Sequence, residues 1–205
     1  TGRVYPGMTS IMDDSTIPGL TRLAEAIKDG GARANCQLIH YGRYASRLDV
    51  GPPVGPSVVP PLVPKFETVR ELDEDGIKEQ IDACAKAAKR AVQAGFDCVE
   101  IVSFLIANFI SPWTNRRTDK WGGSLENRTR ILVETVDAMR KAVGPDFPII
   151  MRMFGDELMP VGSTQEELRK VAQMGEEAGH DAYGVIVAWH ETTIPFLTMD
   201  VTPGQ

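Results

Sequence analysis

Apolar side chains recur along this chain with two alternating patterns. One pattern has helical spacing, as at Leu20, Leu23, Ala24 and Ile27; the other consists of short, continuous apolar runs typical of buried strands. Glycines close the helical segments, as expected at helix C-termini. The helical pattern predicts helices over residues 16–29, 73–94, 124–142 and 164–178. The apolar runs predict strands over residues 33–39, 97–102, 148–153 and 182–188.

This alternation of strands and helices predicts an α/β fold with parallel strands. A doubly wound sheet and a (β/α)8 TIM barrel both satisfy it. No G-x-G-x-x-G follows a strand, which disfavours the dinucleotide-binding sheet. Distinctive polar or aromatic residues stand at or just beyond the predicted strand ends, where a barrel has its active site. They are Gln37, His40, Arg43, Arg152, Trp189 and His190.

The number of elements fits only part of a barrel. Four strands and four helices are predicted over residues 1–205, taken as one domain, whereas a closed barrel has eight of each. We expect an incomplete barrel with an apolar interior and two unpaired edges, which are prone to aggregation. The segment should therefore be completed by a second copy, by another polypeptide, or by further residues of a longer chain.

Composition and charge exclude several classes of function. The chain has 205 residues, a net charge of −6 and 42% hydrophobic residues, and the negative charge argues against nucleic acid as a partner. No run of 18 apolar residues is present, so no membrane span is expected. Cys36, Cys84 and Cys98 form no C-x-x-C pair, which favours reduced thiols and a cytoplasmic protein. The histidines lack zinc spacing, so no metal site is expected.

The polar segment Ser111–Arg128 is the most distinctive part of the chain. It reads SPWTNRRTDKWGGSLENR, and Ser124 has the position of a helix N-cap. Its arginines can pin a long loop through bonds to aspartate and backbone oxygens, or they can bind an anion. The residues alone favour neither role.

This segment resembles the loop after the fourth strand of the old yellow enzyme and 2,4-dienoyl-CoA reductase family of FMN oxidoreductases. A second motif, QLIHYGR at residues 37–43, is similar to the Q-L-x-H-x-G-R motif after that family's third strand. The resemblance covers nearly the whole chain and corresponds to the barrel from the end of strand 2 to the loop after strand 6. It implies FMN and NAD(P)H as cofactors. The cysteine cluster that holds an iron–sulfur centre in larger relatives is absent from this sequence, so such a centre is expected only in a further C-terminal part.

Two residues are candidates for binding the flavin ring. A glutamine near a strand end is more often a satisfied core amide, but the resemblance implies that Gln37 bonds the pyrimidine edge of the isoalloxazine ring. An arginine inside an apolar run, Arg152, needs an anion. Either it pairs with Asp156 or Glu157, or it lies beside the flavin N1–C2=O group, as the resemblance implies. His40 and Arg43 are expected to shape the loop.

The step Trp189-His190-Glu191 supplies a candidate catalytic residue. Histidine titrates near neutrality and can donate a proton. A surface histidine bonded to Glu191 is the simpler interpretation. The resemblance to dienoyl-CoA reductases points instead to His190 as the residue that polarises a substrate carbonyl or assists protonation.

One departure from the family pattern affects the chemistry. Phe104 stands where the family has a proton-donating tyrosine, and the histidine that usually follows Glu100-Ile101 is replaced by Val102. Phenylalanine cannot donate a proton. The sequence therefore leaves two hypotheses: an oxidoreductase, or a non-catalytic, degenerate barrel subunit that has lost its flavin and its acid. An aldolase-type barrel is disfavoured because no strand ends in a lysine.

For the oxidoreductase hypothesis, the resemblance implies reduction of an activated C=C bond. The proline-rich stretch Val50–Pro64 is similar to that of larger, thioester-reducing members. An enone or acyl-CoA thioester is therefore the expected substrate, and association with identical chains or with the rest of a longer chain is expected.

Overall fold

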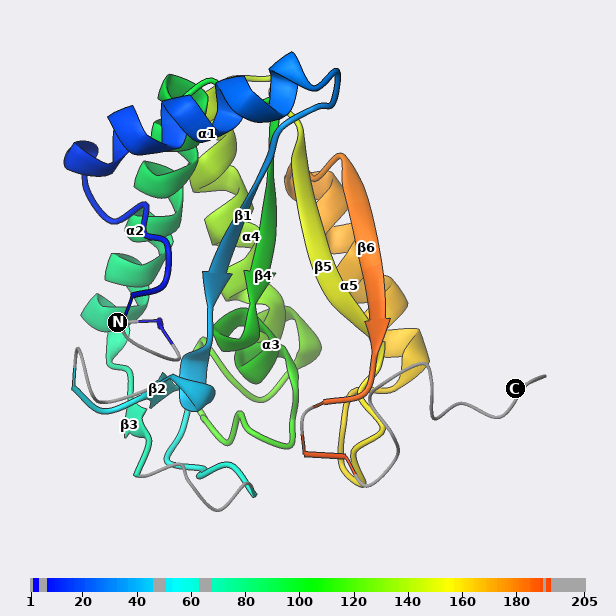
Figure 1. The fold of residues 1–205 in the computed structure, drawn as a ribbon. Helices are drawn as coiled ribbons and strands as arrows, with labels where there is room; N and C mark the ends of the chain where they lie inside the picture. The colour runs from blue at the N-terminus through cyan, green and yellow to red at the C-terminus, as the bar shows by residue number, and fades with distance from the viewer. Residues whose placement is uncertain (1, 4–6, 46–50, 63–67, 190, 193–205) are drawn as a thin grey trace.

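Four parallel strands form the central sheet of the computed structural model (Figure 1). The structure describes residues 2–3, 7–45, 51–62, 68–189 and 191–192. The strands lie in the order β1-β4-β5-β6. Their bounds are β1 Asn35–His40, β4 Cys98–Ser103, β5 Ile149–Asp156 and β6 Ala182–Val187.

Long helices cover one face of this sheet and leave the other face open (Figure 1). Alternate strand residues such as Leu38, Ile101 and Met151 point to the helices and are at most 7% exposed, as the two-residue repeat of a strand requires. These helices are α2 Glu74–Gln93, α4 Leu125–Val143 and α5 Gln165–Ala178, whereas α1 Ile17–Asp29 runs across one end of the sheet and contacts α2. The side chains of Asp73, Ser124 and Thr164 cap α2, α4 and α5 by accepting backbone N–H bonds.

All four predicted helices and all four predicted strands are confirmed, and no predicted end differs by more than three residues. Two features were not predicted. The apolar run after β4 continues directly into a short helix, α3 (Phe104–Ile110), because Ser103 caps it by accepting from the Ile106 amide. The prolines between residues 40 and 72 lead us to expect no regular structure there. This expectation is wrong for two short segments: β2 (Val54–Gly55) and β3 (Arg70–Glu71) pair in parallel.

The sheet is an open segment of a (β/α)8 barrel. Each edge strand, β1 and β6, pairs with one neighbour among the described residues. On β6, Val185 and Val187 are 65% and 53% exposed. They lie on a face that a following helix covers in a complete barrel. Within the described residues, no helix has the length and apolar character needed to cross a membrane.

Candidate active site

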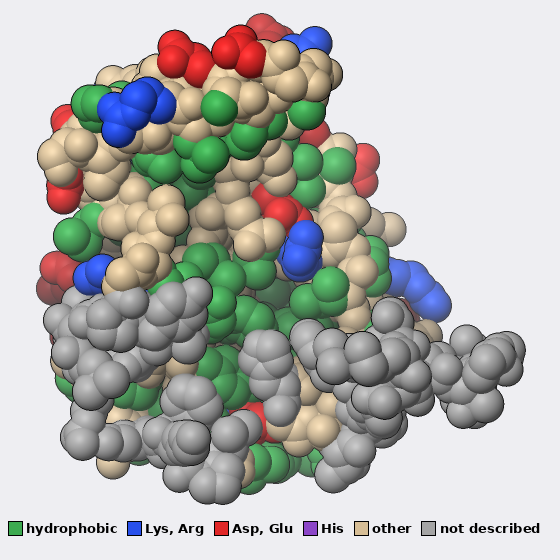
Figure 2. Space-filling view, in the orientation of Figure 1, with side chains coloured by type: hydrophobic (Ala, Val, Ile, Leu, Met, Phe, Trp, Pro, Cys, Tyr) green, Lys and Arg blue, Asp and Glu red, His purple; other side chains and the backbone are tan. Residues whose placement is uncertain are grey.

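A row of polar side chains crosses the open face of the sheet, which is the inner face of the barrel. The Gln37 amide nitrogen (Nε2) donates to Glu100 Oε2 at 2.8 Å. The Arg152 guanidinium donates from Nε to Glu100 Oε1 at 2.9 Å, and its Nη2 lies 2.9 Å from the same oxygen in an ion pair. The three residues come from the adjacent strands β1, β4 and β5. Figure 2 shows acidic and basic groups side by side in the middle of this face.

Strand alternation places these residues together. Gln37 and Glu100 are direct partners in the β1–β4 register, so their side chains point to the same face. Arg152 is two residues beyond Ile150, the register partner of Glu100. It also lies on this face and reaches back to the carboxylate. Gly184 of β6, opposite Arg152, adds no side chain, and a Cβ there would lie 3.5 Å from Glu100 Oε1. The face therefore stays open beside the ion pair.

The two ring-binding candidates are thus brought together, although not at strand ends as predicted. Gln37 lies in the middle of β1, and β5 continues to Asp156, beyond Arg152. The alternative in which Arg152 pairs with Asp156 or Glu157 is wrong, because the guanidinium pairs with Glu100. Arg152 is also not buried: its side chain is 39% exposed, against 8% for Glu100. A guanidinium on an open face can meet a ligand as well as its carboxylate partner.

Aromatic rings line the carboxyl end of the strands, beyond the polar row. The Phe104 ring stacks on Tyr41, with centroids 5.5 Å apart and planes at 17°. It also lies 6.4 Å from the Phe154 ring. Phe154 in turn contacts Trp189, with centroids 5.7 Å apart. This aromatic rim, formed by Tyr41, Phe104, Phe154 and Trp189, makes the mouth of the barrel segment apolar.

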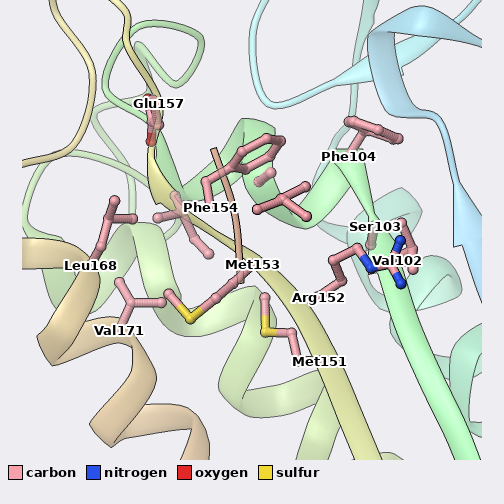
Figure 3. Close-up of a pocket in the computed structure, with 13 residues that line it drawn as sticks. Val102, Ser103, Phe104, Met151, Arg152, Met153, Phe154, Glu157, Leu168 and Val171 are labelled. Atoms are coloured by element: carbon pink, nitrogen blue, oxygen red, sulfur yellow. The ribbon is translucent and has the colours of Figure 1, made fainter. Parts of the chain in front are cut away.

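A cavity of about 30 Å³ lies beneath this rim, between the sheet and the helices (Figure 3). Arg152 extends toward Val102 and Ser103 at one side, whereas Glu157 lies on the other side of Phe154. Glu157 is 2% exposed and accepts a hydrogen bond from the Ser111 hydroxyl at 2.6 Å. Burial raises the pKa of the Glu157 carboxyl. The cavity is large enough for about one water molecule.

Arg43 joins the loops that follow the two edge strands. Its guanidinium forms an ion pair with Glu191, and both side chains are at most 1% exposed. Arg43 also donates to the carbonyls of Val59 and Pro60 at 3.1 and 2.9 Å. Glu191 further accepts from the Tyr44 hydroxyl and, at 3.1 Å, from the Leu62 amide. The prediction that Arg43 shapes the loop is confirmed.

His40 also has a structural role in this loop. Its Nδ1 accepts a hydrogen bond from the Gly42 amide at 2.9 Å, and burial lowers its pKa to about 4. The ring is therefore neutral near pH 7. His190, the candidate catalytic residue, lies outside the described residues. The Glu191 carboxylate is buried against Arg43 and Tyr44, and both interpretations of His190 stay predictions.

The arginines of the polar segment Ser111–Arg128 hold this loop in place. Arg117 pairs with Asp119 and Glu71 and donates to the Leu72 carbonyl at 2.7 Å. Arg128 pairs with Glu167 at 2.6 Å and bonds the carbonyl of Ile110. Of the two roles left open by the sequence, loop pinning is the one that these contacts fulfil.

Glu100 is the residue that sequence reasoning missed. Its signal was present, because an acidic residue inside the apolar run Cys98–Ser103 must find partners in the folded protein. Which residues those partners are depends on the strand order. No cluster of three or more His, Cys, Asp or Glu residues suited to a metal ion occurs among the described residues.

The open inner face with its polar row and aromatic mouth defines the class of protein: a segment of a barrel with an enzyme-type site at the carboxyl side of its strands. The chain belongs to the NADH:flavin oxidoreductase / NADH oxidase family, whose family model matches residues 1–197. The relatives that it matches are oxidoreductases.

Known relatives resemble this chain over part of their length. A metal reductase of Desulforamulus reducens is 47% identical over 206 residues, covering 99% of this chain and 31% of the relative. An NADH:acrylate oxidoreductase of Vibrio harveyi is 38% identical, covering 89% of this chain and 20% of the relative. The solved complex of 2-naphthoyl-CoA reductase with 2-naphthoyl-CoA superimposes with a TM-score of 0.94 at 39% identity, covering 99% of this chain and 33% of that one. The chain thus spans a third or less of these three relatives.

Proposed function

We propose that this chain forms part of an FMN-dependent NAD(P)H oxidoreductase that reduces an activated C=C bond in an enone or enoyl-CoA thioester. The observation that carries this proposal is the row Gln37–Glu100–Arg152 on the open inner face. Relatives named for acrylate and for 2-naphthoyl-CoA support the substrate class. When bound, FMN supplies hydride transfer from the nicotinamide to the double bond.

The residues present on the inner face fit a planar heterocycle. Gln37 uses its amide nitrogen on Glu100, so its carbonyl oxygen is left to accept from the pyrimidine edge of the ring. Arg152 is partly exposed and supplies a positive charge for the electron-rich N1–C2=O side of the ring. A fixed cation there favours the negative charge that accompanies flavin reduction. Gly184 adds no side chain beside Arg152 and Glu100.

The aromatic rim and His190 act on the substrate side in this proposal. Phe104 and Phe154 exclude water from the mouth, which strengthens the electrostatic interactions inside it. His190 polarises the substrate carbonyl or assists protonation. Its chain neighbours Trp189 and Glu191 are both buried at the edge of the mouth. A CoA thioester or a similarly bulky conjugated carbonyl compound suits this apolar entrance.

A spectroscopic experiment tests the proposed function. The full-length polypeptide containing this segment should purify with bound FMN, and it should bleach when NADH or NADPH is added under argon. Reoxidation should then follow when an enone or enoyl-CoA thioester is added. The competing function, a non-catalytic barrel subunit, is favoured by Phe104 at the position of the family's acid. A colourless protein that gains no flavin absorbance when FMN is added would establish that alternative.

Restoring a phenol at position 104 tests whether the missing acid limits the reaction. We expect Phe104→Tyr to speed substrate-dependent reoxidation at least about tenfold, because a positioned general acid contributes 10²–10⁴-fold. The half-buried ring can present a hydroxyl to the mouth without disturbing its stack on Tyr41. The rate of flavin reduction by NADH should not change. Stopped-flow absorbance measures this rate separately from reoxidation. An unchanged reoxidation rate would show that protonation comes from another group. Phe147→Tyr, at a half-buried position in the loop before β5 and away from the mouth, serves as the control for the added hydroxyl.

A further inference from the structure

We infer that Glu100 is a positioning residue that sets both the reduction potential of the bound flavin and the orientation of the Gln37 amide. The inference rests on the proposed FMN site. It assigns a role to a residue that contacts both proposed ring-binding side chains. Each of its two carboxylate oxygens serves one of them, Oε2 for Gln37 at 2.8 Å and Oε1 for Arg152 at 2.9 Å.

The charge of Arg152 is balanced by Glu100 at short range. Two nitrogens of the guanidinium lie 2.9 Å from the same carboxylate oxygen, so the pair is close to neutral when seen from the inner face. A neutral pair stabilises an anionic ring less than a lone cation does. Glu100 therefore lowers the preference of the site for reduced over oxidised flavin, and so holds the reduction potential below the value that Arg152 alone would give.

The same carboxylate fixes which end of the Gln37 amide faces the ring. An ionised carboxylate only accepts hydrogen bonds, so the Gln37 nitrogen must face Glu100 and its carbonyl oxygen is presented elsewhere. A neutral amide at position 100 could donate as well as accept, and this orientation would be lost. Glu100 is 6% exposed, and this burial protects the arrangement from competition with water.

Neutral variants at these positions should fold. The Arg152 side chain is 39% exposed, so Glu100→Gln leaves a cation that water can solvate instead of a buried unpaired charge. Arg152→Gln keeps an amide N–H that can donate to Glu100. Both single variants and the double variant are therefore suitable for measurement, and thermal unfolding of each protein verifies its folding.

The test measures the flavin reduction potential of the full-length, FMN-loaded protein by equilibration with reference dyes. Glu100→Gln should raise the potential, Arg152→Gln should lower it, and the double variant should return it close to the wild-type value. We expect each single variant to change the ratio of the affinities for reduced and oxidised FMN at least about tenfold. This corresponds to a shift of about 30 mV in the reduction potential of the two-electron couple. Glu177→Gln, at an exposed position near the end of α5, is the matched control.

A double-mutant cycle tests the orientation of the amide. Gln37→Met should weaken FMN binding in the wild-type protein and weaken it much less in the Glu100→Gln background, because the amide is no longer held there. Equal effects in both backgrounds would overturn this part of the inference.

The outcomes separate the two proposals. Unchanged potentials in both single variants, or shifts of the same sign, would overturn the role of Glu100 while the FMN site stands, because a general disturbance cannot produce opposite signs. A wild-type protein that binds no FMN would overturn the proposed function and this inference together.

Discussion

Arg152→Gln is expected to weaken FMN binding roughly 10- to 100-fold. In the proposed site the guanidinium donates to the ring and supplies a positive charge, and a hydrogen bond to a charged group contributes about 1.5–3 kcal/mol. Each 1.4 kcal/mol corresponds to a tenfold change in the dissociation constant. The loss also leaves Glu100 without its counterion on the same face, which disfavours an electron-rich ligand further.

Titration of the apoprotein with FMN, followed by absorbance or fluorescence, measures this effect. Arg169→Gln is the matched control, because Arg169 is exposed on α5, away from the inner face. Arg152→Lys should fall between the wild-type protein and Arg152→Gln, since lysine keeps the charge but loses the planar fork. Unchanged FMN retention in Arg152→Gln would refute the assignment of this residue to the flavin.

Arg43→Met is expected to lower the free energy of unfolding by about 3–5 kcal/mol, the cost of breaking a buried ion pair. The substitution leaves the Glu191 carboxylate, whose side chain is 0% exposed, without a cation. It also removes the bonds to the Val59 and Pro60 carbonyls. Because these contacts join the loops after β1 and β6, the loss should loosen the mouth as well as destabilise the fold.

Denaturant unfolding of the full-length protein measures the change. The double variant Arg43→Met/Glu191→Leu should recover a large part of the lost stability, since an apolar pair can replace a buried ion pair at little cost. Lys170→Met is the control: its i,i+4 pair with Glu166 is exposed, so a change below about 0.5 kcal/mol is expected. A loss of similar size in the control and in Arg43→Met would show that the buried pair contributes no special stability.

Local sequence patterns were sufficient for the main elements of the fold. The helices and strands around the sheet follow from apolar spacing and capping residues such as Ser124, which act within a few residues of the chain. The pairing of β2 with β3 could not be predicted in this way, because their partner residues are 16 positions apart along a proline-rich segment. The start of α3 was also hidden, since one apolar run spans both β4 and the helix.

In the candidate site, too, local sequence patterns identified some residues, whereas contacts between distant parts of the chain could not be predicted. Gln37 and Arg152 were found from motifs and from the cost of a charge in an apolar run, but their shared partner Glu100 was not. Gln37 and Glu100 are 63 residues apart in the sequence, and Glu100 and Arg152 are 52 residues apart. Only the register of the neighbouring strands brings these side chains together. Likewise, the sequence offered Glu191 only as a possible partner of its neighbour His190, and its ion pair with Arg43, 148 residues earlier in the chain, could not be predicted.

By itself, the sequence determined the alternating parallel elements, the family resemblance and the residue types available for chemistry, because these depend on short-range periodicity and on motifs. Only the tertiary structure decided which charges neutralise one another, which arginines pin loops and which one faces the open interior. Those outcomes depend on strand order and register, which bring together side chains that no local pattern connects.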